Sequence, residues 1–150
     1  MKIKLNEILE YIQNNIPITK ELKVSITKYT GDFIVIDAPL AANINHKNSA
    51  FGGSLSSIAI LSAWALLFVK QKELSLDVTL VIQESKFSFL LPVLKDFQAL
   101  AYAPNEEDFN KFLKILNKKG KARLKIYSEI ICDGKVCGTH EGSYVAIKNT

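Results

Sequence analysis

Residues 43–54 read Asn-Ile-Asn-His-Lys-Asn-Ser-Ala-Phe-Gly-Gly-Ser, and an uncharged, mostly apolar run from Leu55 to Val69 follows them. The first part is a polar loop, which leads through the pair Gly52-Gly53 into a segment long enough for a helix. The start of such a helix presents unpaired backbone N–H groups, which suit an anion or a polarised carbonyl oxygen. The helix is apolar on nearly every face, so the rest of the chain must wrap around it.

The whole chain has the size and composition of one packed domain, which we expect to span residues 1–150. It has 150 residues, 48% of them apolar, and a net charge of +4 from 19 basic and 15 acidic side chains. That charge is too small to indicate nucleic acid as a partner. The first residues carry charges and lack the apolar centre of a signal peptide, so we expect a cytoplasmic protein.

The uncharged segment from Asn48 to Val69 raises the question of a membrane span. A span needs about 20 predominantly apolar residues, and asparagine, serine and glycine interrupt the first part of this segment. We therefore expect a buried core helix and no membrane span.

Two cysteines, Cys132 and Cys137, flank the dipeptide Asp133-Gly134. A two-residue turn there would not place the thiols opposite each other, so we expect reduced thiols, whereas a longer turn would bring them together and allow a disulfide. The sequence has no second Cys or His pair to complete a zinc site, and we expect neither a metal nor a cofactor.

Apolar periodicity and turn residues predict three helices and six strands in an α+β arrangement. Because strands outnumber helices and tight turns join several of them, we expect a curved, largely antiparallel sheet around the central helix. The small residues Ser56, Ala59 and Ala63 would let the two approach closely. The expected elements are a helix at 6–14, a hairpin within 22–39 turning at 31–32, the central helix, strands at 77–91 and 97–102, a helix between Asn105 and Gly120, and a hairpin of 122–132 and 136–147.

The strand expected at 77–91 carries a carboxylate of interest. Alternation places Val78, Leu80 and Ile82 on one face, with Glu84 next in the same row, and Val81, Phe87 and Phe89 on the other face. A carboxylate in that row is either partly buried, which suits a general base, or lies beyond the buried zone.

Together these segments resemble the hot-dog fold thioesterases, in which a curved antiparallel sheet wraps a long central helix. More narrowly, the loop from Asn43 to Leu55, the helix with Trp64 and the strand that ends in Leu91-Pro92-Val93 are similar to one thioesterase family. That family also forms the C-terminal half of bacterial proteins that begin with an acetyltransferase-like domain. The resemblance covers essentially all of the chain from Asn6 on.

In the better known hot-dog acyl-CoA thioesterases an Asn precedes a His-Gly-Gly motif, and a carboxylate follows one to two turns into the central helix. The resemblance matches Asn45 to that Asn, Phe51-Gly52-Gly53 to His-Gly-Gly, and Ile60 to the carboxylate. The glycines therefore carry over, whereas the histidine and the helix carboxylate do not.

Thioester hydrolysis needs a polarised carbonyl and an activated water. We expect the Gly53 amide to stabilise the oxyanion, Asn45 to hold the water or the thioester, and His46 or Glu84 to act as base. Each also has a structural reading, such as a tight glycine turn, a loop Asn that satisfies local backbone, or an exposed loop histidine. We expect substrate contacts from Asn43, Phe51, Gly52, Ser54, Ser57 and Ser85, although single serines are also common as capping or packing residues. Trp64 is expected in the core or at an interface.

The resemblance implies an acyl thioester hydrolase that acts on acyl-CoA or acyl-carrier-protein thioesters. It also implies a homodimer or a dimer of dimers, since resembling proteins build each site between two subunits. The alternatives are a non-catalytic acyl-CoA-binding module, which the missing helix carboxylate favours, a hot-dog dehydratase or isomerase, and a structural dimer without a ligand. A basic run near the end of the last helix consists of Lys118, Lys119, Lys121 and Arg123. It is read either as a helix C-terminus that favours cations or as a site for coenzyme A phosphates.

Overall fold

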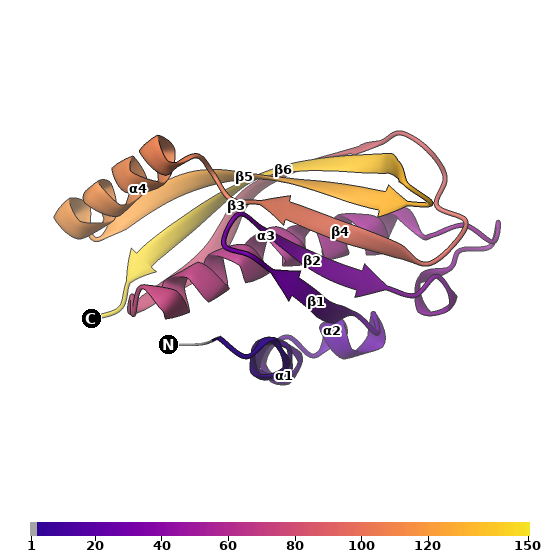
Figure 1. Cartoon of the computed structure of the whole chain (residues 1–150), viewed down its shortest axis with the longest axis horizontal. Coiled ribbons are helices and arrows are strands. Elements are labelled where there is room, and N and C mark those ends of the chain that lie inside the picture. The colour runs from indigo at the N-terminus through magenta and orange to yellow at the C-terminus, as the bar shows by residue number, and fades with distance from the viewer. Residues whose placement is uncertain (1–2) are drawn as a thin grey trace.

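The computed structural model describes residues 3–150 as one curved antiparallel sheet around a long helix, α3 (Figure 1). The sheet has six strands in the order β1-β2-β4-β5-β6-β3, so β1 and β3 lie at its two edges. Every neighbouring pair is antiparallel, as expected. The strands are β1 (Ser25–Tyr29), β2 (Phe33–Ala38), β3 (Val78–Phe89), β4 (Phe97–Tyr102), β5 (Lys121–Cys132) and β6 (Lys135–Lys148). The helices are α1 (Leu5–Asn15), α2 (Ile18–Glu21), α3 (Gly52–Glu73) and α4 (Glu106–Lys119), with a 3-10 turn at Ala41–Asn43.

Helix α3 is the core of the molecule. It packs against every strand from β2 to β6, and its residues Ile58, Ala59, Ala63 and Leu66 are fully buried. Ala59 and Ala63 confirm the expected close approach of helix and sheet. By length and composition α3 could also cross a membrane, but 61% of its most apolar window is buried inside the fold. This burial identifies α3 as the core helix.

Local capping signals fix the ends of α4 as the sequence predicts. Asn105 accepts a hydrogen bond from the backbone N–H of Asp108 at 2.8 Å, which satisfies an amide of the first turn. Gly120 adopts the left-handed conformation (φ 75°) that ends many helices, at little cost for a residue without a Cβ.

The C-terminal hairpin turns at Asp133 and Gly134, both with positive φ (53° and 73°). This two-residue turn pairs Cys132 with Lys135, so the cysteines are not cross-strand partners. Both thiols are free and buried, as expected for the shorter turn.

A β-bulge in β3 overturns the expected row of side chains. The register with β6 shifts between Ile82 and Glu84, which leaves Gln83 as an extra residue and exchanges the two faces of the strand beyond it. Glu84 therefore lies on the outer face of the sheet, opposite to Ile82. Phe87 and Phe89 lie on the inner face, toward α3, and not with Val81 as predicted.

Gly138 on β6 makes room for the ring of Phe87. A Cβ at this position would lie 2.5 Å from Cζ of Phe87 and 3.3 Å from the carbonyl oxygen of Ser88. We therefore expect Gly138→Ala to destabilise the protein by about 1–3 kcal/mol, as measured by thermal or urea unfolding.

The matched control is Gly138→Ala in a Phe87→Leu background. Leucine removes the ring atoms that clash, so alanine should cost less there than in the parent. An equal cost in both backgrounds would contradict the steric explanation.

Candidate active site

The loop at residues 43–51 is held at its base by backbone bonds. Ile44 and Ala50 form a β-bridge, and the N–H of Phe51 donates to the carbonyl of Asn43 at 2.7 Å. The N–H of Ala50 donates to the carbonyl of Val93 at 2.8 Å, which ties the loop to the β3–β4 connection. The bridge sets the direction of the loop, which leaves the sheet and returns at the first residue of α3 (Figure 1).

Asn43 belongs to the buried foot of the loop and not to an open site. Its side chain is 2% exposed and donates to the carbonyls of Leu22 and Pro39, both at 2.9 Å. We predicted a substrate contact for Asn43, and the structure instead buries its amide nitrogen against backbone.

Asn45 organises the loop from inside. Its side-chain oxygen accepts from the N–H groups of Lys47 at 2.8 Å and Ser49 at 3.1 Å, and its amide nitrogen donates to the hydroxyl of Ser49 at 3.0 Å. This is the Asx-type arrangement in which an Asn side chain replaces backbone partners in a tight turn. Asn45 therefore sets the position of the exposed His46.

Helix α3 begins at Gly52 without a side-chain cap. Phe51, just before it, is extended, and the N–H groups of Gly52, Gly53 and Ser54 find no acceptor within residues 3–150. Gly53 is exposed and Gly52 half-buried, so the amides of the first turn are open to a ligand. The dipole of a long helix adds partial positive charge at this end.

Two aromatic rings flank the glycines. A Cβ at Gly53 would collide with the ring of Phe51, and one at Gly52 would lie 3.1 Å from Cε1 of Phe89. Phe51 is 55% exposed and Phe89 62% exposed. At Gly53 a Cβ fits only if the Phe51 ring moves away, whereas at Gly52 the exposed Phe89 ring would need to shift by only a few tenths of an ångström. Gly53 is therefore the position where the absence of a Cβ lets a ring lie close to the helix start.

An apolar groove of about 320 Å³ adjoins these glycines. It is lined by Ala50, Gly52, Leu55, Phe89, Leu90, Leu91, Pro92 and Val93. An uncapped helix start beside an apolar groove can hold a polarised carbonyl together with the hydrocarbon chain attached to it.

The remaining predicted residues fall in three places. Ser54 and Ser57 follow on the first turns of α3, where Ser57 is exposed. Helical spacing places four residues on one side of α3, and we call this side the open stripe of α3. These residues are Gly53, Ser57, Ile60 and Trp64. Trp64 donates its indole N–H to the carbonyl of Leu80 at 3.0 Å, so the open stripe runs beside the edge strand β3. Ser85 lies on the inner face of β3, whereas the exposed Glu84 faces outward.

The structure thus brings Phe51, Gly52, Gly53 and Ser54 together and separates Glu84 from them. The sequence analysis missed Phe89, because the bulge that turns it toward Gly52 leaves no clear mark in the residue pattern. It also missed His140 and Tyr144, which lie buried behind Ser85. Their spacing of four residues in a strand was an available signal, since it places both on one face.

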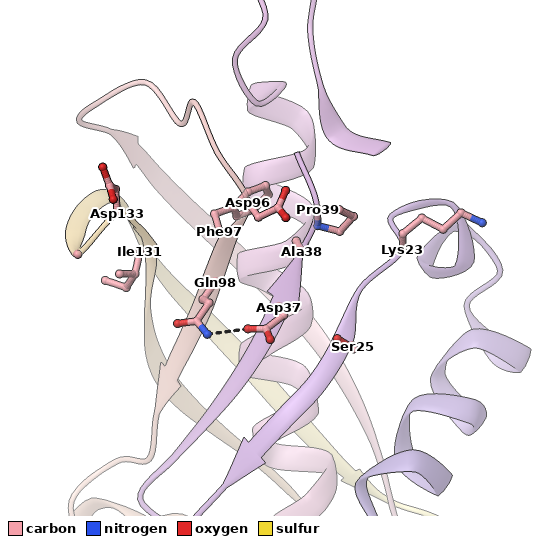
Figure 2. Close-up of a pocket in the computed structure, with 11 residues that line it drawn as sticks. Lys23, Ser25, Asp37, Ala38, Pro39, Asp96, Phe97, Gln98, Ile131 and Asp133 are labelled. Atoms are coloured by element: carbon pink, nitrogen blue, oxygen red, sulfur yellow. Dashed lines mark hydrogen bonds between the residues drawn. The ribbon is translucent and has the colours of Figure 1, made fainter. Parts of the chain in front are cut away.

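The two largest of the other hollows described lie away from the glycines. Figure 2 shows one of about 520 Å³, seen from the outer side of the sheet, where Gln98 donates to Asp37 at 2.7 Å. None of the predicted site residues lines it. The other, of about 500 Å³, includes Lys119, Lys121 and Arg123 of the basic run.

Comparison with known proteins connects this arrangement to a family. Residues 5–148 match the family described as "Putative thioesterase (yiiD_Cterm)". The chain belongs to this family. Because the match covers nearly the whole chain, it confirms the resemblance inferred from the loop and the strand after the helix.

Solved structures agree with this thioesterase family membership. A protein of unknown function from Chlorobaculum tepidum is 29% identical, with a TM-score of 0.92 over 96% of this chain and 94% of that one. A protein from Shewanella oneidensis described as a putative thioesterase is 27% identical, with a TM-score of 0.87 over 95% and 96%. A thioesterase from Haemophilus influenzae is 16% identical, with a TM-score of 0.73 over 99% and 93%, and at that identity it shows the fold alone. The expected hot-dog fold is confirmed, and the family supports thioesterase activity in general.

Proposed function

We propose that this protein hydrolyses acyl thioesters of coenzyme A or of acyl carrier protein in the cytoplasm. The observation that carries the proposal is the uncapped start of α3, where the amides of Gly52 and Gly53 are open beside an apolar groove. Membership of the thioesterase family supports thioester hydrolysis in general.

In the proposed reaction the thioester carbonyl oxygen accepts hydrogen bonds from the amides of Gly52 and Gly53. Attack by water places negative charge on that oxygen, and fixed donors at a helix start stabilise it without reorganisation. The acyl chain lies against Phe51 and Phe89 and enters the groove beside Leu91. Ser54 and Ser57 border the same end of α3 and would contact the polar part of the substrate.

The proposed base is His46. An imidazole can accept the proton of water near neutral pH, and the Asn45 side chain holds the turn from which His46 projects. We assign no role in this step to Glu84, because the bulge in β3 directs its carboxylate to the outer face of the sheet.

We further propose a homodimer that pairs through β3. This strand has 12 residues at the edge of the sheet, with Val81, Ile82 and Phe89 exposed. A long, apolar edge strand is a template for pairing with another strand. A second copy paired there would also cover the open stripe of α3 and close the site between two subunits.

The test is a panel of acyl-CoA substrates of increasing chain length with a reagent that detects the released thiol. We expect turnover above the uncatalysed rate for at least one chain length. Turnover for none of them would contradict the proposal. Acyl-CoA that still raises the melting temperature in that case would favour the non-catalytic acyl-binding module.

A further inference from the structure

A chain of three polar side chains crosses the inner face of the sheet, away from the glycines. The hydroxyl of Ser85 on β3 lies 3.3 Å from Nδ1 of His140, and Nε2 of His140 lies 3.0 Å from the phenol oxygen of Tyr144. That phenol is also 3.3 Å from the carbonyl oxygen of Ile60 on α3. Ser85 is exposed, whereas His140 and Tyr144 are 0% and 1% exposed. We call these residues the Ser–His–Tyr chain.

The hydrogen-bond directions in this chain follow from its inner end. The carbonyl of Ile60 can only accept, so the single phenol hydrogen of Tyr144 is donated to it. Tyr144 must then accept from Nε2–H of His140. A neutral imidazole carries one N–H, so Nδ1 is an acceptor and receives the hydroxyl hydrogen of Ser85. Burial lowers the pKa of His140 and raises that of Tyr144, so both are neutral at pH 7 as this order requires.

The strand is built to allow this contact. A Cβ on Gly142, which lies between the two residues, would be 2.7 Å from both Nε2 of His140 and Cε1 of Tyr144. Only glycine at this position leaves space for imidazole and phenol to meet across the strand. The surroundings of Ser85 are apolar, since Ile82 and Phe87 flank it on the inner face of β3.

We propose that Ser85 is an acyl acceptor, with His140 as its general base and Tyr144 as the residue that positions the imidazole. An exposed hydroxyl that donates to a buried imidazole, itself oriented by a third group, is the arrangement of an activated serine nucleophile. The Cα atoms of Ser85 and Phe89 are four residues, or about 13 Å, apart along β3. Because Phe89 is the β3 residue beside Gly52, the Ser85 centre is separate from the glycine amides of its own protomer. The identity of the natural acyl donor, a thioester, rests on the proposed function, whereas the reactivity of the Ser85 hydroxyl does not.

In the proposed step the Ser85 oxygen bonds to the acyl carbon and its proton passes to Nδ1 of His140. The carbon–sulfur bond breaks, and the leaving thiolate takes that proton as a thiol. Water then attacks the acyl-serine ester and gives a proton to Nδ1. His140 returns it to the Ser85 oxygen as the ester bond breaks and the carboxylic acid leaves.

The test uses a fluorophosphonate probe, which bonds to activated serines, with the labelled residue located by mass spectrometry. We expect labelling of Ser85 in the native protein and none at that position in Ser85→Ala. Removal of the base in His140→Gln should slow labelling by about 10²–10⁴-fold. Tyr144→Phe should slow labelling less, because the imidazole loses the partner that orients it but remains present as the base. Ser88→Ala is the matched control, since Ser88 lies on the outer face of the same strand and its loss should change nothing.

The pH profile separates this role from a purely structural one. Labelling should rise as His140 loses its proton, with a midpoint below the usual value of about 6.5, because burial lowers the pKa of His140. The residues that face His140 carry no charge. They are Tyr144 on the same strand, Phe87 opposite it on β3, Ser128 opposite it on β5, and Ile60 of α3, which contacts Tyr144. Glu141 lies on the outer face and acts weakly in the opposite direction.

The outcomes for the two proposals are distinct. An absence of labelling at Ser85 in the folded native protein overturns this inference, and so does labelling that His140→Gln leaves unchanged. If Ser85 is labelled while no acyl-CoA is hydrolysed, the inference stands and the proposed function fails. If acyl-CoA is hydrolysed equally well by Ser85→Ala and the probe does not react, the proposed function stands alone.

Discussion

Replacement of Gly52 by proline is expected to lower kcat for thioester hydrolysis by about 10²–10³-fold, the effect of losing one oxyanion donor. Proline has no N–H, so one of the open amides at the start of α3 disappears. The backbone tolerates the change because the first helical position favours proline. Phe51 already has φ −64° and ψ 130°, the conformation that a residue before proline prefers. Initial rates with the best acyl-CoA of the panel, together with the melting temperature, would measure the effect.

The matched control is Gly52→Ala. Alanine and proline both place a Cβ near the ring of Phe89, at 3.1 Å from Cε1, but alanine keeps the amide hydrogen. We expect the alanine variant to retain most of its turnover. Equal turnover in the proline and alanine variants, with both folded, would show that this amide does not take part in the reaction.

The second large effect is expected at the edge of the sheet. Ile82→Glu places a charge on β3 where the proposed dimer brings two copies together, so desolvation and repulsion of the two carboxylates oppose pairing. We expect the molar mass from light scattering to fall from a dimer to the 16.7 kDa of one chain. Turnover should fall with it, because the proposed site is closed by the second subunit.

Ile115→Glu on α4 provides the control for surface charge. Ile115 is 38% exposed and Ile82 is 37% exposed, so the two substitutions alter solubility and local hydration to a similar degree. We expect Ile115→Glu to remain dimeric and active. A dimer that survives Ile82→Glu would contradict pairing through β3.

Much of the fold follows from local patterns in the sequence. The uncharged run after Gly53 predicts α3, because a helix that is apolar on nearly all faces must be wrapped. Asn105 and Gly120 predict the ends of α4 through caps that depend on a few neighbouring atoms. Asp133-Gly134 predicts the tight C-terminal turn in the same way.

The bulge in β3 could not be predicted, because it depends on how β3 pairs with β6. A strand of alternating residues looks regular until its partner fixes the register, and one extra residue at Gln83 then exchanges every face beyond it. That exchange sends Glu84 outward and Phe89 toward Gly52. The candidate site therefore follows from local chain geometry at Phe51-Gly52-Gly53, which lead into α3 as the sequence predicts. The predicted faces of Glu84 and Phe89 are wrong, because they depend on strand register.

The same reasoning applies to the loop asparagines. The sequence shows that Asn43 and Asn45 lie in a polar loop before a helix, but not which backbone groups need partners. Asn43 bonds to Leu22 and Pro39, and Leu22 is distant along the chain. Local sequence carries no record of such a contact.

The most direct test of the account is a crystal structure with a non-hydrolysable acyl-CoA analogue that keeps its carbonyl group. The account predicts the carbonyl oxygen at about 2.7–3.1 Å from the backbone nitrogen of Gly52 or Gly53, the range for an oxyanion donor. It also predicts the acyl chain beside Phe89. A carbonyl bound elsewhere, for example in the hollow of Figure 2 beside Asp37, with the amides of α3 facing only water, would contradict it.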